Sequence, residues 1–219
     1  MSATELSPDD RSHGLWRPVG AVLALWFALA VVAGYSGLLE ADPAALPVAL
    51  MVAIVPPILA FLALYGASSP FRRFVLALDL RLLTMVHAWR MVGFVFLVLY
   101  GYGMLPGLFA WPAGLGDMAV AATAPLVVIA LVERPEFVRH RAFVTWHLLG
   151  LLDFAVAVAT GVLTSGGFPE IVGDTVSSAP LAALPLSLIP SFVVPLFVIL
   201  HLAALLQARH LARVAAARA

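Results

Sequence analysis

The sequence alternates between long apolar runs and short polar segments. Six runs dominate it, covering residues 18–38, 45–65, 82–105, 111–132, 143–163 and 184–206. Each run reaches the roughly 20 residues that an α-helix needs to cross the hydrocarbon core of a bilayer. The pattern therefore predicts an all-α fold, a polytopic membrane helical bundle with six transmembrane helices.

Three regions follow from this pattern. We expect a six-helix transmembrane domain over residues 17–208. A polar segment precedes it at 1–16 and is predicted to be a disordered cytoplasmic tail. Residues 209–219 keep a helical composition with arginines, and are predicted to be a basic extension of the last helix into the membrane interface.

Prolines modify two of the expected helices. Pro56 and Pro57 lie near the middle of the second run and should kink or break that helix. The last run contains Pro185, Pro190 and Pro195, which predict a bent helix that begins late. The segment 164–183, the longest between two runs, is expected to be a flexible connection, or else a lid or a docking loop for a partner.

The composition supports lipid as the main surroundings. The chain is 63% hydrophobic and 11% charged, whereas soluble domains carry about 25% charged residues. It has no Cys, which excludes disulfides and thiolate metal sites, and no Lys, which excludes a Schiff-base lysine. The formal net charge of +0 gives no reason to expect nucleic acid as a partner. Membrane lipid is the expected partner, together with other membrane proteins or further copies of the chain.

The arginines predict an orientation. If six runs cross the membrane, all but Arg90 of the twelve arginines lie on one side. The opposite loops, 39–44, 106–110 and 164–183, contain no arginine, and the first and the last of them contain acids. Because cytoplasmic loops carry the excess of basic residues, both termini are predicted to be cytoplasmic and the protein to be a multi-pass protein of the inner membrane.

Several ionisable side chains interrupt the apolar runs, and such groups tend to be functional. They are His87, Arg90, Asp117, His147, Asp153 and His201. At about 1.5 Å of rise per residue, the three histidines lie roughly 6–9 Å below the cytoplasmic boundary, in one layer. Asp153 is expected near the middle of the membrane. Asp117 is expected near the outer side, outside this layer, where it caps the Gly- and Pro-rich turn or contacts a ligand.

Spacing relates these residues further. His87 and Arg90 are three apart and share a helix face. Gly150 lies three residues after His147 and permits the close approach of another helix or a flat ligand. Arg90 with Asp153 is the expected ion pair. The sequence thus predicts a buried His/Arg/Asp cluster in the cytoplasmic half of the bundle.

Four interpretations of this cluster remain open. In the first, the polar groups fix helix register, and the protein is a structural or accessory component of a membrane assembly. In the second, the histidines and Asp117 and Asp153 titrate along the path of a proton-linked transporter. In the third, His87, His147 and His201 hold zinc or copper with an open fourth position, in a metal-dependent membrane enzyme.

In the fourth interpretation the protein is a redox protein that binds haem b. Two imidazoles on facing helices can ligate one iron from opposite sides, and Arg90 can pair with a propionate. Trp89, Met85 and Met91 are suitable neighbours of the porphyrin. Trp146 would also be a neighbour, although its position fits an anchor at the membrane interface better.

Overall fold

The computed structural model describes residues 15–42, 45–168 and 176–217, and this part of the chain is all-α with no strand. Most of the predicted tail at 1–16 lies outside the described residues, as do residues 218–219 of the predicted extension. The first described helix, α2 (Trp16–Tyr35), begins at the end of the predicted tail.

Six helices are long and apolar enough to cross a membrane, which confirms the predicted number. Besides α2 they are α3 (Val48–Ala67), the composite helix Leu80–Gly101, α7 (Gly107–Glu133), α8 (Arg141–Leu163) and the composite helix Ile189–Ala216. The helix Leu80–Gly101 consists of α5 (Leu80–Met85), a 3₁₀ segment η1 (Val86–Gly93) and α6 (Phe94–Gly101). The helix Ile189–Ala216 consists of a π-helical segment η4 (Ile189–Val193) and α10 (Val194–Ala216).

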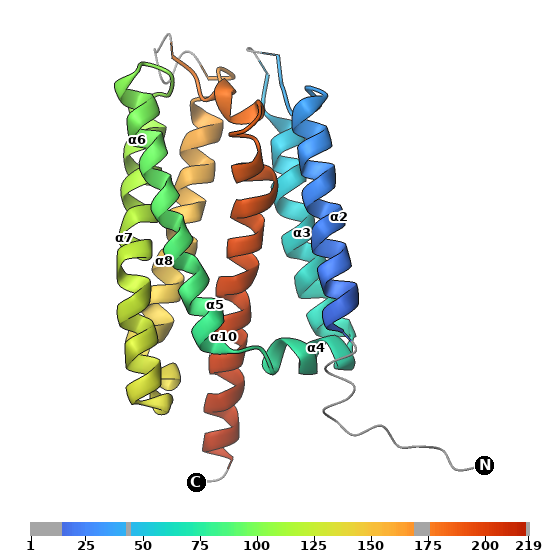
Figure 1. Cartoon of the computed structure of the whole chain (residues 1–219), viewed down its shortest axis with the longest axis vertical. Helices are drawn as coiled ribbons and strands as arrows, with labels where there is room; N and C mark the ends of the chain where they lie inside the picture. The colour runs from blue at the N-terminus through green and yellow to red at the C-terminus, as the bar shows by residue number, and fades with distance from the viewer. Residues whose placement is uncertain (1–14, 43–44, 169–175, 218–219) are drawn as a thin grey trace, which may run out of the picture.

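The last helix is central in the bundle (Figure 1). α10 lies between a group formed by α6, α7 and α8 on one side and the pair α2 and α3 on the other. It contacts α8, α3 and α5, while α2 contacts η4. Residues of α10 are therefore placed to meet side chains from both groups.

The arginines gather at one end of the bundle, where α2 begins and α10 ends (Figure 1). Every described arginine except Arg90 belongs to a segment at this end: Arg17, Arg72, Arg73, Arg81, Arg134, Arg139, Arg141, Arg209 and Arg213. The separation predicted from the sequence is thus present in the described residues.

A short amphipathic helix, α4 (Ser69–Leu76), lies across this end of the bundle (Figure 1). Phe74 and Val75 are buried, whereas its arginines are exposed. Arg72 donates hydrogen bonds to the carbonyl oxygens of Tyr65 and Gly66, at 3.0 and 2.6 Å, and so satisfies carbonyls that the end of α3 leaves free. This helix was not predicted from the sequence.

The prolines act differently in the two helices. α3 continues through Pro56 and Pro57, so of the predicted kink or break, the break does not occur. The expected late start of the last helix is confirmed, because its continuous part begins only at Ile189. Pro190 is the second residue of the π-helical segment. It has no N–H group and so cannot extend the regular hydrogen-bond ladder.

The long connection between α8 and η4 is described only in part, since residues 169–175 lie outside the described residues. Its second part packs against the bundle. The Ser178 hydroxyl donates a hydrogen bond of 2.6 Å to the carbonyl of Gly161, and Leu181 and Ala182 are buried in the short 3₁₀ helix η3 (Ala179–Ala182). This part covers the end of the bundle opposite the arginines.

Candidate functional site

The 3₁₀ segment η1 aims three residues at the bundle interior. A 3₁₀ helix has three residues per turn, so side chains three apart are eclipsed. His87, Arg90 and Gly93 follow this spacing, and all three are buried. The predicted shared face of His87 and Arg90 is therefore confirmed, in a tighter helix than the α-helix that we expected.

The same geometry turns the proposed haem neighbours outward. Trp89 is 77% exposed, and Met85 and Met91 are also exposed. These side chains face away from the histidines and do not border the site.

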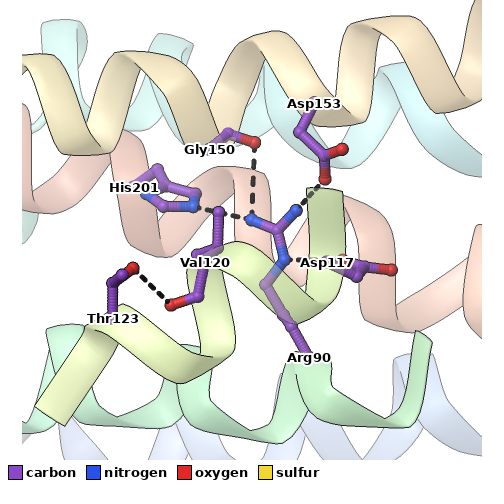
Figure 2. A network of polar contacts seen from close by, with 7 residues as sticks. All are labelled: Arg90, Asp117, Val120, Thr123, Gly150, Asp153 and His201. Carbon is purple, nitrogen blue, oxygen red and sulfur yellow. Dashed lines mark hydrogen bonds and ion pairs between the residues drawn. The ribbon is translucent and has the colours of Figure 1, made fainter. Parts of the chain in front are cut away.

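Arg90 is the centre of the polar network (Figure 2). Its side chain is 1% exposed. Nε donates to Asp117 Oδ1 at 2.7 Å, and Nη2 donates to Asp153 Oδ2. Nη1 lies 3.4 Å from the carbonyl oxygen of Gly150 and 3.1 Å from His201 Nε2. The guanidinium carbon also lies 3.9 Å from the centre of the Phe154 ring, so each part of the group has a partner.

The ion pair of Arg90 with Asp153 confirms one prediction, and the pair with Asp117 corrects another. We expected Asp117 near the outer side, away from the cluster. α7 begins at Gly107 rather than Trp111, however. Four more residues at about 1.5 Å each carry Asp117 roughly 6 Å deeper, to the level of Arg90.

Three glycines make room for the partners of Arg90. A Cβ atom on Gly93 would overlap the Asp117 side chain, and one on Gly116 would overlap Asp153. A Cβ atom on Gly150 would overlap the imidazole of His201. The expected close approach at Gly150 is confirmed, and the partner there is a histidine of the last helix.

The three histidines, from η1, α8 and α10, converge beside Arg90. All three are 0% exposed. His87 and His201 are stacked, with ring centres 3.7 Å apart, and His147 Nδ1 lies 2.8 Å from His201 Nδ1. The sequence could not show that these helices bring their imidazoles together.

Hydrogen bonding fixes the proton positions on two of the rings. Arg90 can only donate, so His201 Nε2 accepts and the proton of this neutral ring is on Nδ1. His201 Nδ1–H then donates to His147 Nδ1, which leaves the proton of His147 on Nε2.

Three ring nitrogens of this cluster have no hydrogen-bond partner among the described residues. They are Nδ1 and Nε2 of His87 and Nε2 of His147. More than about 90% of buried polar groups are hydrogen-bonded, and leaving one unsatisfied costs about 1–3 kcal/mol. The cluster therefore contains unsatisfied polar atoms where a purely structural cluster would be satisfied.

Aromatic side chains enclose the imidazoles. Phe143 and Trp146 lie 4.5 and 4.8 Å from the His147 ring, and Phe197 lies 5.4 Å from His87, centre to centre. Trp146 also donates to Thr123 Oγ1 on α7 at 2.8 Å. Trp146 is thus a wall of the site, which corrects its interpretation as an interface anchor.

This arrangement fits a metal ion better than a haem. Haem ligation from opposite sides needs two imidazoles that face each other across the porphyrin, whereas His87 and His201 are stacked face to face. One nitrogen from each of the three histidines lies within 4.8 Å of the others, so the three could hold a metal ion. Nitrogens bound at about 2.0–2.1 Å to one tetrahedral zinc are roughly 3.3 Å apart, which is within the spread of these nitrogens.

Comparison with known proteins identifies a family but no activity. No curated protein matches the chain, and no solved structure matches it. Residues 45–209 match a family described as a domain of unknown function, DUF8737. The matched stretch begins before α3 and ends within α10, so it contains the three histidines, Arg90 and both aspartates. The chain therefore belongs to the DUF8737 family.

Proposed function

We propose that this protein is a membrane metalloprotein in which His87, His147 and His201 hold one transition-metal ion, with zinc the best candidate. The observation that carries the proposal is the convergence of three buried imidazoles, two of which have ring nitrogens without a partner. A metal ion would bind one nitrogen of each ring, which would give the unpartnered His87 ring a partner and displace the proton between His147 and His201.

The donor set favours zinc and suggests what the ion could do. Imidazole nitrogen suits zinc and copper, and three histidines with an open fourth position are the ligand set of catalytic rather than structural zinc. The three imidazoles are neutral ligands, so the ion would keep its double positive charge. Such an ion polarises a bound water or a substrate oxygen.

Arg90 and the two aspartates have a supporting role in this proposal. The guanidinium nitrogens of Arg90 contact Asp117, Asp153, Gly150 and His201. These contacts connect η1 to α7, α8 and α10. This favours the structural interpretation for the ionic part of the cluster. Arg90 also contacts the His201 ring, through Nη1 and Nε2 at 3.1 Å.

The proposed setting is the inner membrane, with both termini in the cytoplasm. The gathering of the described arginines at the end where α2 begins supports this orientation under the positive-inside rule. His147 follows the start of α8 at Arg141 by less than two turns, so the site would lie in the cytoplasmic half.

Metal analysis of the purified protein tests the proposal. Wild-type protein from zinc-supplemented cells should contain one zinc per chain by elemental analysis. His87→Ala, His147→Ala and His201→Ala should each lose it. His140→Ala and His210→Ala are matched controls, because both histidines are exposed, and should keep it.

A second measurement uses only wild-type protein, because a histidine variant that fails to fold would also lose metal. Wild-type protein stripped with a chelator should bind Co²⁺ with the intense visible absorption of a four-coordinate ion. Wild-type protein without stoichiometric metal, or a stripped protein that shows no such band, would overturn the proposal.

A further inference from the structure

A cavity of about 260 Å³ lies on the other side of Arg90 from the histidines. Its walls come from α3, η1, α6, α7, α8 and the start of the last helix. Arg90 and Asp117 line it, but none of the three histidines does. The cavity is thus a second site, separated from the imidazoles by the guanidinium and by Phe154.

The walls are mainly aromatic and aliphatic. Four phenylalanines line the cavity, contributed by α6, α7, α8 and α10: Phe96, Phe109, Phe154 and Phe197. The rings of Phe96 and Phe109 meet edge to face with centres 5.1 Å apart, which gives this wall a fixed shape. Faces of aromatic rings attract cations as well as apolar groups.

The charged groups of the cavity favour a cation. Arg90 is balanced by Asp153, its partner away from the cavity, so the carboxylate of Asp117 is in excess. Asp117 Oδ1 accepts from Arg90, and Oδ2 accepts no hydrogen bond from the described residues. Glu40, which is exposed and follows α2, adds a second carboxylate to the rim.

The volume limits the size of a ligand. A cavity of about 150 Å³ can bind benzene, so 260 Å³ has room for about ten non-hydrogen atoms. We propose that this cavity binds a lipophilic amine, an apolar molecule of about this size with one ammonium group that pairs with Asp117. This inference goes beyond the proposed metal site and does not depend on it.

Photolabelling tests the inference on the full chain in lipid nanodiscs. The probes are an octyl chain bearing a diazirine and ending in an amine, an alcohol or a carboxylate, and labelled peptides are mapped by mass spectrometry. The amine should label the cavity walls at least about tenfold more than the carboxylate, since a charge-assisted hydrogen bond is worth that ratio.

Two variants on one helix give a matched comparison. Ala157 lines the cavity, whereas Ala159, half a turn away on α8, is exposed. Ala157→Phe should abolish labelling of the walls, and Ala159→Phe should leave it unchanged. Glu40→Gln should weaken labelling by the amine alone without touching the Arg90 network.

Two results would overturn the inference. Equal labelling by the three probes would mean that the cavity is an apolar hole without preference for a cation. Labelling by the amine that persists in Ala157→Phe would mean that the probe binds elsewhere. Zinc content, measured on the same samples, reports on the metal site independently.

Discussion

Arg90 shows at the scale of one residue how a charge is accommodated at membrane depth. A cation there is costly unless paired, and this one contacts two carboxylates, a carbonyl oxygen, an imidazole nitrogen and an aromatic face. Its contact with His201 also makes Nε2 of that ring an acceptor. The position of protons on the histidines therefore depends on Arg90.

Replacing Arg90 should reveal the energetic cost of burying two carboxylates without a cation. Arg90→Gln leaves Asp117 and Asp153 without their cation, and we expect a loss of roughly 3–5 kcal/mol in the free energy of unfolding. Unfolding in mixed micelles measures it. Arg72→Gln is the control, because this exposed arginine also bonds backbone carbonyls but has no carboxylate in the network.

Removing the charges together should restore stability. The triple variant Arg90→Gln, Asp117→Asn, Asp153→Asn should be more stable than Arg90→Gln alone, since no unpaired charge remains. The double variant Arg90→Gln, Asp153→Asn, which keeps Asp117, should recover less stability. A triple variant no more stable than the single one would contradict the ionic account of this network.

At the scale of helices, small residues decide how closely the spans approach. Gly93, Gly116 and Gly150 each face a side chain of the network on a neighbouring helix, at contacts that leave no room for a Cβ atom. Small residues at such contacts are typical of helix packing in membranes.

A glycine substitution tests this packing. Gly116→Ala should lower the free energy of unfolding by about 1–3 kcal/mol, because the added methyl group would overlap Asp153. Gly20→Ala is a matched control in the interior of α2, where nothing lies within 4 Å of the added atom. Equal thermal midpoints for the two variants would show that the interface between α7 and α8 is looser than described.

Sequence could predict the spans and part of the site, for identifiable reasons. The lengths of the apolar runs predicted the number of helices. The three-residue spacing predicted that His87 and Arg90 share a helix face. Asp117 was misplaced because depth was counted from Trp111, while Pro106 and Gly107 start the helix one turn earlier. The meeting of His87, His147 and His201 depends on how three helices rotate and pack, which no local pattern encodes.

At the scale of the whole molecule, the charged groups differ between the two ends of the bundle. The described arginines other than Arg90 lie at one end with α4, while Glu40, Ser178 and the rim of the cavity lie at the other. The metal site proposed here is nearer the first end, and the amine site opens toward the second. Arg90 separates the two.

The absence of cysteine from the sequence makes this orientation easy to test. Single cysteines at the exposed positions Ala41 and Glu136 lie on opposite ends of the bundle. A maleimide that cannot cross membranes should label Ala41→Cys in intact spheroplasts and Glu136→Cys only after they are opened. Labelling of both in intact spheroplasts, or the reverse order, would refute the orientation.

The most direct measurement of the central claim is X-ray absorption at the zinc edge on purified wild-type protein. The account predicts one zinc per chain with three imidazole nitrogens at about 2.0–2.1 Å and one oxygen ligand. Zinc at well below one per chain, or a first shell without the scattering signature of imidazole rings, would contradict it.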